Sequence, residues 1–348
     1  MTSSATAPNK VAAASAQPPL LEALAAVHSQ PLWDRYKSLN TKEPHVHAPM
    51  IWPWEVMSPL VERASREVSM HEAERRALLF VHPDFPGTVF TTPTLSGALQ
   101  ILLPGESAPP HRHTLAALRL VMKGEGAVTI VDGKRCVMEP GDLVLTPAFS
   151  WHEHVHEGRQ PMVWFGGLDY PLARGLQDVF FEHGPGPTPD RGLAALSDAA
   201  LAEGGVLPDD VPSRTAYSPL YRYAWSRVKQ VLDATPAQPD GSKRLRYVNP
   251  VDGGAVMPTI DCHALRLDRG AATKAQRTTA TAMVVVIEGE GETRIGDTNL
   301  RWKQHDVFTL PRWMWTEHRS AAGNATLFVM SDRELMKRID HLREESQA

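Results

Sequence analysis

The residues best suited to chemistry are histidines in the segment from residue 111 to residue 154. His111 and His113 lie two positions apart, and His152 follows an apolar stretch, LVL, later in the same segment. Side chains alternate between the two faces of a strand, so the first two imidazoles point the same way. Glycine turns, an alternating run AVTIV and a Pro-Gly-Asp corner separate this pair from His152. The pattern predicts a small antiparallel barrel that gathers three imidazoles at one point.

Three imidazoles at one point favour a metal ion with open coordination positions. Neutral imidazole binds iron, zinc, copper and nickel, whereas a structural zinc normally takes four protein ligands. No fourth ligand is evident, and Arg119 lies on the strand that follows the histidine pair. Around Fe(II), an uncharged set of three histidines would leave room for a bidentate anionic substrate and O2. Arg119 could then hold a carboxylate of that substrate.

The chain contains a second copy of this segment. The sequence EGEG at 288–291 aligns with KGEG at 123–126, and HDVFTLPRWMWTEH aligns with GDLVLTPAFSWHEH. One duplication that produced two barrels explains this repeat. At the three histidine positions the second copy carries Gln276, Thr278 and Thr316. We therefore expect the second copy to bind no such metal and to have a structural role, either closing the first barrel or forming an oligomer interface.

Composition limits the classes of partner. The chain has 348 residues and a formal net charge of −4, and no block of Lys and Arg stands out. We therefore expect a small-molecule partner, and neither nucleic acid nor a membrane surface. No apolar run is long enough to span a membrane. Cys136 and Cys262 lie far apart without CxxC spacing, which favours reduced thiols in the core and a cytoplasmic location.

We expect six segments along the chain. They are a disordered tail at 1–19, a helical and strand segment at 20–95 that packs on the barrels, an N-terminal barrel with the metal site at 96–170, a connector at 171–245, a C-terminal barrel without metal at 246–330 and a C-terminal helix at 331–348. Within 20–95, helical spacing predicts one helix from residue 20 and another after residue 31, with Trp33 and Tyr36 facing inward. The terminal helix begins with the capping-box pattern Ser331-x-x-Glu334.

Several longer motifs are specific enough to indicate a family. They are AERRALLF, the block that runs from PPHRHT to WHEH, GLDYP, and YVNPVDGG followed by MPT. From about residue 31 to the C-terminus, the chain resembles the bicupin ring-cleaving dioxygenases typified by gentisate 1,2-dioxygenase and salicylate 1,2-dioxygenase. The resemblance implies a mainly β fold of two β-barrel or jelly-roll domains, each a double-stranded β-helix, with short helices at both ends of the chain.

The resemblance also implies a reaction and a set of site residues. The N-terminal barrel would bind one Fe(II) per chain through His111, His113 and His152. Residues that contact the substrate in the family correspond to Arg75, Gln100, Arg119 and His154. The implied reaction opens the C1–C2 bond of a 2-hydroxybenzoate with O2, as a step of aromatic catabolism. The family also implies a homotetramer.

Departures from the family pattern bear on the substrate. Many gentisate enzymes have an aromatic residue where this chain has Ser96, and an Asp where it has Gly166. That Asp is a candidate partner for the 5-hydroxyl of gentisate, and a site without it should recognise such a hydroxyl less well. We group Ala98 with these two residues as a specificity pocket. The hypothesis is a 5-substituted salicylate such as 5-nitrosalicylate, with gentisate as the other candidate.

The residues alone leave alternatives open. Arg75 and its neighbour Arg76 also fit a solvated helix end, Gln100 fits a hydrogen-bonded core amide, and Ser96 and Gly166 fit neutral drift. A metal cupin isomerase or decarboxylase would carry the same barrel and ligands. A bicupin that binds an aromatic acid without catalysis is a third function. Oxygen consumption together with a new ultraviolet chromophore distinguishes the dioxygenase from both.

Overall fold

The computed structural model describes residues 19–184, 196–202 and 206–347, so almost all of the predicted tail at 1–19 lies outside the described residues. The chain divides into two compact units, residues 1–44 and 45–348. The first unit contains α1 (Leu20–Ala26) and α2 (Leu32–Leu39), which confirms both predicted helices. Trp33 and Tyr36 are 68% and 57% exposed. Their predicted inward orientation is wrong, because the described part of this unit has no core on which they could pack.

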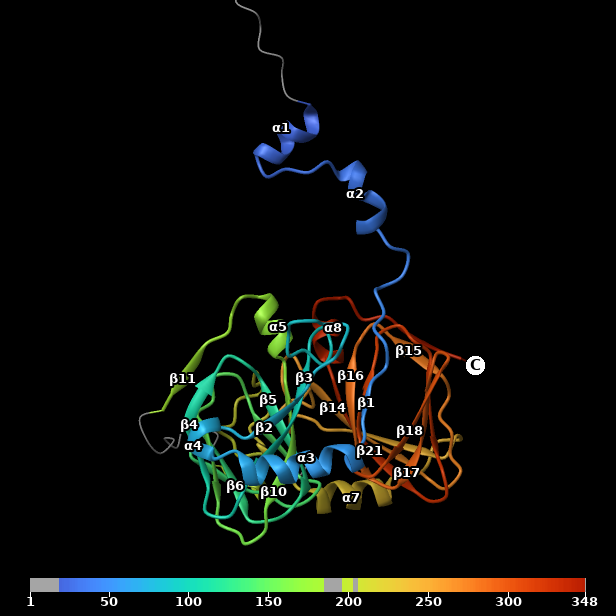
Figure 1. The fold of residues 1–348 in the computed structure, drawn as a ribbon. Helices are drawn as coiled ribbons and strands as arrows, with labels where there is room; N and C mark the ends of the chain where they lie inside the picture. The colour runs from blue at the N-terminus through green and yellow to red at the C-terminus, as the bar shows by residue number, and fades with distance from the viewer. Residues whose placement is uncertain (1–18, 185–195, 203–205, 348) are drawn as a thin grey trace, which may run out of the picture. The chain divides into compact units, whose positions relative to one another are not determined.

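The second unit contains a first barrel made of two sheets. Its strands are β2 (Ala77–Phe80), β3 (Ser96–Leu102), β4 (Ser107–His113), β5 (Ala117–Lys123), β6 (Ala127–Val131), β7 (Lys134–Val137), β8 (Leu143–Thr146), β9 (His152–His156), β10 (Met162–Leu168), β11 (Phe181–His183) and β12 (Arg222–Tyr223). One sheet has the order β12-β8-β5-β10-β3-β2 and the other β11-β4-β9-β6-β7. Figure 1 shows most of these strands in cyan to green. Val121, Val131 and Trp164 belong to the apolar core that the two sheets share.

A second barrel repeats this plan. Its strands are β1 (Ile51–Trp52), β13 (Ser242–Arg246), β14 (Asp261–Leu267), β15 (Gln276–Thr278), β16 (Ala282–Glu288), β17 (Glu290–Ile295), β18 (Thr298–Lys303), β19 (Val307–Leu310), β20 (Thr316–Ser320), β21 (Ala325–Ser331) and β22 (Glu344–Ser346). The orders are β1-β19-β16-β21-β14-β13 and β18-β17-β20-β15-β22. Leu99 and Phe165 of the first barrel share a core with Met283 and Met330 of the second. The two barrels confirm the predicted mainly β architecture.

Register and turn geometry both confirm the duplication. Gln276 pairs with Thr316 across β15 and β20, as the equivalent residues of β4 and β9 do in the first barrel. Gly124 and Gly289, aligned by the repeat, both have φ above +80°. A Cβ at either glycine would lie within 2.5 Å of a backbone oxygen, 2.2 Å at the first and 2.4 Å at the second. Only glycine fits both the backbone angle and the space at these turns.

Each barrel contains one strand from the segment that precedes the other barrel. β1, from the N-terminal segment, pairs with β19 of the second barrel, whereas β12, from the connector, pairs with β8 of the first. Each exchanged strand leads into a helix, α3 (Trp54–Glu67) or α7 (Trp225–Ala234). The N–H of Trp54 donates to Asp306 (2.6 Å), and that of Trp225 donates to Asp142 (2.8 Å). Each barrel therefore provides the carboxylate that stabilises the start of the helix preceding the other barrel.

A second reciprocal contact involves two buried aspartates. Asp169 accepts hydrogen bonds from the N–H of Ala116 (2.9 Å) in its own barrel and from the hydroxyl of Thr259 (2.6 Å) in the second. Asp332, at the end of the second barrel, likewise accepts from the N–H of Thr281 (2.6 Å) in its own barrel. It also accepts from the hydroxyl of Thr94 (2.6 Å), next to β3 of the first barrel. Burial raises the pKa of Asp169 to about 6 despite these hydrogen bonds. The two carboxyl groups tie the barrels together.

The other helices are short. They are α4 (Met70–Ala73), α5 (Tyr170–Gly175), α6 (Asp198–Ala202) and α8 (Arg333–Arg338). The helix predicted at 331–348 is correct only for α8, and the chain then forms β22. Ser331 ends β21 and donates to the carbonyl of Thr281 (2.9 Å), so the predicted capping box is wrong. A capping box is present instead at Ser69 and Glu72, at the start of α4.

Two further features bear on the environment of the chain. Among the described residues, no helix combines the length and apolar character needed to cross a bilayer. Cys136 and Cys262 are both buried and unpaired, as predicted. Burial raises the pKa of both thiols, which keeps them protonated.

Asp169 predicts a pH dependence of stability. Its pKa of about 6 in the fold exceeds the value of about 3.9 for a free Asp. The contribution of this carboxyl to the free energy of unfolding is therefore largest below pH 4. It falls by roughly 3 kcal/mol in all as the pH rises through 6. We expect the free energy of unfolding of the wild type, relative to Asp169→Asn, to fall by that order between pH 4 and pH 7. Urea denaturation measures it, with exposed Asp210→Asn as the control; a pH-independent difference would contradict the assignment.

Candidate active site

The three predicted histidine ligands meet on one face of the first barrel. His111 and His113 belong to β4, His152 begins β9, and His111 pairs directly with His152. One ring nitrogen from each lies within 4.8 Å of those of the other two. The β4–β9 register shifts by one residue between Ala108 and His111, where the Pro109-Pro110 pair forms a bulge. Prolines are tolerated there because a bulge leaves a residue unpaired, and the bulge orients the residue that follows.

Backbone carbonyls hold all three rings in one tautomer. The Nδ1 atoms each lie 2.9 Å from a carbonyl oxygen, of Pro109 for His111, of Leu115 for His113 and of Ser150 for His152. A carbonyl can only accept, so each Nδ1 carries the proton and each Nε2 keeps its lone pair. Burial, helped by nearby positive charge, lowers the pKa of His111 to about 3, that of His113 to about 4 and that of His152 well below its ordinary value. Three neutral imidazoles are therefore ready to bind a metal.

Two arginines next to the histidines lack a carboxylate partner. Arg119 is 6% exposed and donates from Nη1 to the hydroxyl of Thr146 (2.8 Å). The guanidinium of Arg75 lies over the ring of Phe181, 4.9 Å from its centre. Neither forms an ion pair with a described carboxylate, and burial together with the charge of Arg75 lowers the pKa of Arg119 to about 9. Arg76, the neighbour of Arg75, instead makes a bidentate ion pair with Glu106 away from the site. This region therefore favours an anion.

His154 presents a hydrogen-bond acceptor to the same region. It is 1% exposed, and its Nδ1 lies 2.9 Å from the hydroxyl oxygen of Thr129. That hydroxyl donates its proton to the sulfur of Met138 (3.0 Å), so its oxygen accepts from Nδ1–H. The Nε2 of His154 is then left with a free lone pair. Burial and the charge of Arg119 lower the pKa of His154 well below its ordinary value, which keeps the ring neutral.

Several polar atoms around the histidines are buried without a partner. Among the described residues they include Nε of Arg75, Nε2 of Gln100, Nε of Arg119, Nε2 of His152, Nε2 of His154 and Nε1 of Trp164. Folded proteins pair most of their buried polar atoms, so a cluster of unpaired ones indicates a place built for a ligand. All but one of these residues were predicted site residues.

The predicted specificity residues differ in what surrounds them. Gly166 pairs with Arg119 of β5 on one side and with Ala98 of β3 on the other, so the three side-chain positions form a row on one face. A Cβ built on Gly166 would meet nothing closer than a backbone oxygen at 4.0 Å. The position is therefore open to a larger group. Ser96 is buried and its hydroxyl donates to the carbonyl of Val89 (3.1 Å), so that hydroxyl stabilises the fold.

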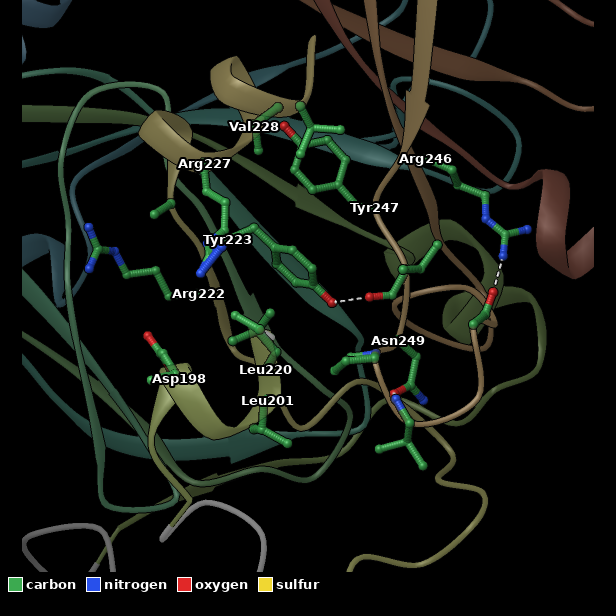
Figure 2. Close-up of a pocket in the computed structure, with 18 of the residues that line it drawn as sticks. Asp198, Leu201, Leu220, Arg222, Tyr223, Arg227, Val228, Arg246, Tyr247 and Asn249 are labelled. Atoms are coloured by element: carbon green, nitrogen blue, oxygen red, sulfur yellow. Dashed lines mark hydrogen bonds between the residues drawn. The ribbon is translucent and has the colours of Figure 1, made fainter. Parts of the chain in front are cut away.

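A cavity of about 850 Å³ lies elsewhere, between the connector and the start of the second barrel. Figure 2 shows its lining, in which the hydroxyl of Tyr223 donates to the carbonyl of Val248 (2.7 Å) and Tyr247 lies beside Val228. None of the predicted site residues lines it. This cavity is therefore separate from the predicted site.

Comparison with known proteins identifies the family. Residues 98–168 match the model of the cupin domain. The chain is 37% identical over 320 residues to gentisate 1,2 dioxygenase 1 of Aquipseudomonas alcaligenes, a match that covers 90% of this chain and 92% of the relative. The chain belongs to the gentisate 1,2-dioxygenase family. It is also 34% identical to 5-aminosalicylate 1,2-dioxygenase of Comamonas sp over 94% of its length and 90% of the relative.

A solved structure of the same family confirms the bicupin fold. Salicylate 1,2-dioxygenase from Pseudoaminobacter salicylatoxidans, determined with gentisate, superposes with a TM-score of 0.85 at 29% identity and covers 96% of both chains. The chain is thus a bicupin ring-cleaving dioxygenase. Ferrous iron is the cofactor of this family, and the three neutral imidazoles of His111, His113 and His152 fit it. Three ligands leave coordination positions for substrate and O2.

This dioxygenase site also contains residues that the sequence did not reveal. Phe181 stacks on His111, with ring centres 5.3 Å apart, because β11 pairs with β4. It lies in the connector, where nothing in the local pattern indicates a strand. Thr129 and Trp164 complete the surroundings of His154. Thr129 could have been found, since it is a polar residue at an inward position of the alternating run AVTIV.

Removing one ligand should greatly weaken iron binding. In His111→Ala the other two imidazoles remain neutral and buried, yet two ligands bind far more weakly than three. Since loss of an outer-shell partner alone typically weakens metal binding 10- to 100-fold, we expect a loss of at least about 100-fold. Metal analysis after dialysis against a chelator measures it, with exposed His71→Ala as the control. Equal iron content in the two variants would contradict the assignment.

Proposed function

We propose that this chain cleaves the ring of a 2-hydroxybenzoate that carries a substituent at position 5. The observation that supports this substrate class is the pair of arginines without carboxylate partners, Arg75 and Arg119, next to three neutral imidazoles. A dianionic chelate would neutralise both the metal and these guanidinium groups. Buried charges are tolerated only when they are paired, so the site is suited to a ligand that carries both a carboxylate and an adjacent oxygen.

The residues of the chain orient this substrate and move its proton. Bound Fe(II) supplies the redox chemistry through which O2 reacts with an aromatic ring. Arg119 and Arg75 hold the carboxylate, and the unpaired amide N–H of Gln100 donates to the carboxylate or the hydroxyl. The lone pair on Nε2 of His154 accepts the phenolic proton, because its Nδ1–H is committed to Thr129. Cleavage between C1 and C2 then incorporates both oxygen atoms and gives an unsaturated oxo-diacid.

The open position at Gly166 supports the substituent at position 5. Gly166 lies in the same cross-strand row as Arg119 and Ala98, and the atom nearest to the place its Cβ would occupy is a backbone oxygen at 4.0 Å. This position offers room and lacks the carboxylate that could bond a 5-hydroxyl. We therefore favour salicylates with an amino, nitro or other group at position 5 over gentisate. Ser96 contributes by its small size alone, since its hydroxyl is bonded to the backbone.

We also propose a homo-oligomer located in the cytoplasm. α1 and α2 expose apolar side chains, namely Leu20, Leu21, Leu32, Trp33, Tyr36 and Leu39, and another subunit would remove such a set from water. The two buried free thiols fit a reducing compartment. Light scattering of the full chain in solution measures the assembly, and a monomer would refute the oligomer.

The reaction itself can be tested with protein loaded with Fe(II) under anaerobic conditions. We expect oxygen consumption and a new ultraviolet chromophore with gentisate, salicylate, 5-aminosalicylate or 5-nitrosalicylate. A decarboxylase or isomerase would consume no O2, and a binding protein would leave every acid intact. Arg119→Gln should lower kcat/KM about 10- to 100-fold, the usual range for a lost charge-assisted hydrogen bond. Exposed Arg135→Gln, at 51% side-chain exposure, is the control.

Substrate preference can be tested at Gly166. Gly166→Asp adds an acceptor at an open position, and we expect it to raise kcat/KM for gentisate relative to salicylate by about tenfold or more. Gly166→Ala fills part of the same space without an acceptor and should leave that ratio nearly unchanged. A wild type that strongly prefers gentisate would contradict the proposed substrate. An unchanged ratio in the Asp variant would place the substituent elsewhere.

A further inference from the structure

The second barrel keeps a cavity at the position of the metal site. It has a volume of about 590 Å³, within the usual range of small-molecule sites, and Gln276, Thr278 and Thr316 line it. These are the residues that replace the three histidines of the first barrel. His318, aligned with His154, is 6% exposed and also lines this cavity. The duplicated site has thus lost its metal ligands but kept its space and its fourth histidine.

The hydrogen bonds of His318 give it the opposite polarity to His154. Its Nδ1 lies 2.8 Å from the hydroxyl oxygen of Thr293, the equivalent of Thr129. Here the indole N–H of Trp302 donates to that oxygen (2.9 Å), whereas in the first barrel the hydroxyl donates to a methionine sulfur. Among the described residues the buried hydroxyl of Thr293 has no other acceptor within reach, so its proton goes to Nδ1 of His318. The Nε2 of His318 then carries a proton and presents a donor to the cavity.

The cavity also has an excess of positive charge. Its lining includes four arginines and two glutamates. Glu344 is paired with Arg333 and Glu345 with Arg277, at 2.6 and 2.7 Å, so these carboxylates are already neutralised. Arg246 donates to the backbone carbonyl of Gly253, and its charge also stabilises the buried carboxylate of Asp261. Arg244 forms no hydrogen bond or ion pair with another described residue, and its charge interacts with the carboxylate of Asp240 from a distance.

The positive charge of Arg244 acts on the imidazole of His318 and lowers its pKa. After burial, that charge is the second cause that lowers the pKa of His318 to about 3. Hence His318 stays neutral and donates through a single N–H, and Arg244 supplies the charge. The lining also includes the apolar side chains of Leu265, Leu310 and Met314. An anionic head group and an apolar body could therefore be bound together.

We propose that this cavity of the second barrel is a metal-independent binding site for a small aromatic carboxylate. The carboxylate accepts hydrogen bonds from His318 and Arg244, and the ring packs on the apolar side chains of the lining. This site is additional to the metal centre. It rests on residues of the second barrel alone, so it stands whether or not the first barrel cleaves the proposed substrate.

Calorimetry with benzoate tests this site without turnover. Benzoate is titrated into the full chain carrying His111→Ala and Arg119→Gln, which remove the metal site of the first barrel and an arginine that holds a carboxylate there. We expect one binding event per chain. Arg244→Gln or His318→Gln, added to this background, should weaken that event about 10- to 100-fold, the range for a lost hydrogen bond to a charged group. Arg294→Gln is the matched control, since Arg294 is an exposed arginine of the same barrel outside the cavity.

Two further measurements separate specific recognition from loss of fold. Benzamide, which has the same ring without the charge, should bind much more weakly than benzoate. Arg244→Gln alone, in the metal-loaded wild-type background, should keep its far-ultraviolet circular dichroism and its ring-cleaving activity. Equal benzoate affinity in the Arg244 and His318 variants and the control, equal affinity for benzamide, or no binding at all would each overturn the proposal.

Discussion

The pairing of β4 with β9, with its one-residue bulge before His111, is the constraint on which this site depends. It places His111 opposite His152, and the two-residue period of the strand brings His113 to the same face. A slip of one residue would turn the whole set to the other face of the sheet. The same strand segments supply the carbonyl groups that orient the rings. Chain pairing therefore sets the position, the tautomer and the neutrality of the ligands together, before any metal binds.

The sequence predicted the two barrels, the metal ligands and the short helices, because each leaves a local or repeated pattern. The i, i+2 histidines, the aligned EGEG and KGEG turns and the corner motifs are all short-range signals. Contacts made by tertiary pairing left no such signal. Phe181 reaches His111 only because a distant strand, β11, joins the sheet. The prediction for the end of the chain was wrong for a similar reason. This charged stretch has helical character, yet it forms β22 and pairs with β15 instead of extending α8.

The two barrels show how few residues separate a metal site from a polar cavity. The backbone register is the same, and the pair of histidine and threonine is retained, at His154 with Thr129 and at His318 with Thr293. What differs is the residue that contacts the threonine, a sulfur acceptor in one barrel and the indole of Trp302 in the other. This residue determines where the threonine hydroxyl proton points, and therefore whether the hydroxyl donates to the imidazole or accepts from it. The identity of one buried neighbour thus decides whether the imidazole accepts or donates.

The reciprocal strand exchange has a consequence for the ancestry and integrity of the molecule. A single ancestral half would have had an unpaired sheet edge and a helix start without its carboxylate, and an identical second chain would have satisfied both. The present chain therefore has the arrangement of a domain-swapped pair whose members became covalently joined. If it were cut between its halves, the fragments would need each other to complete their sheets, and they would reassociate rather than behave as autonomous domains.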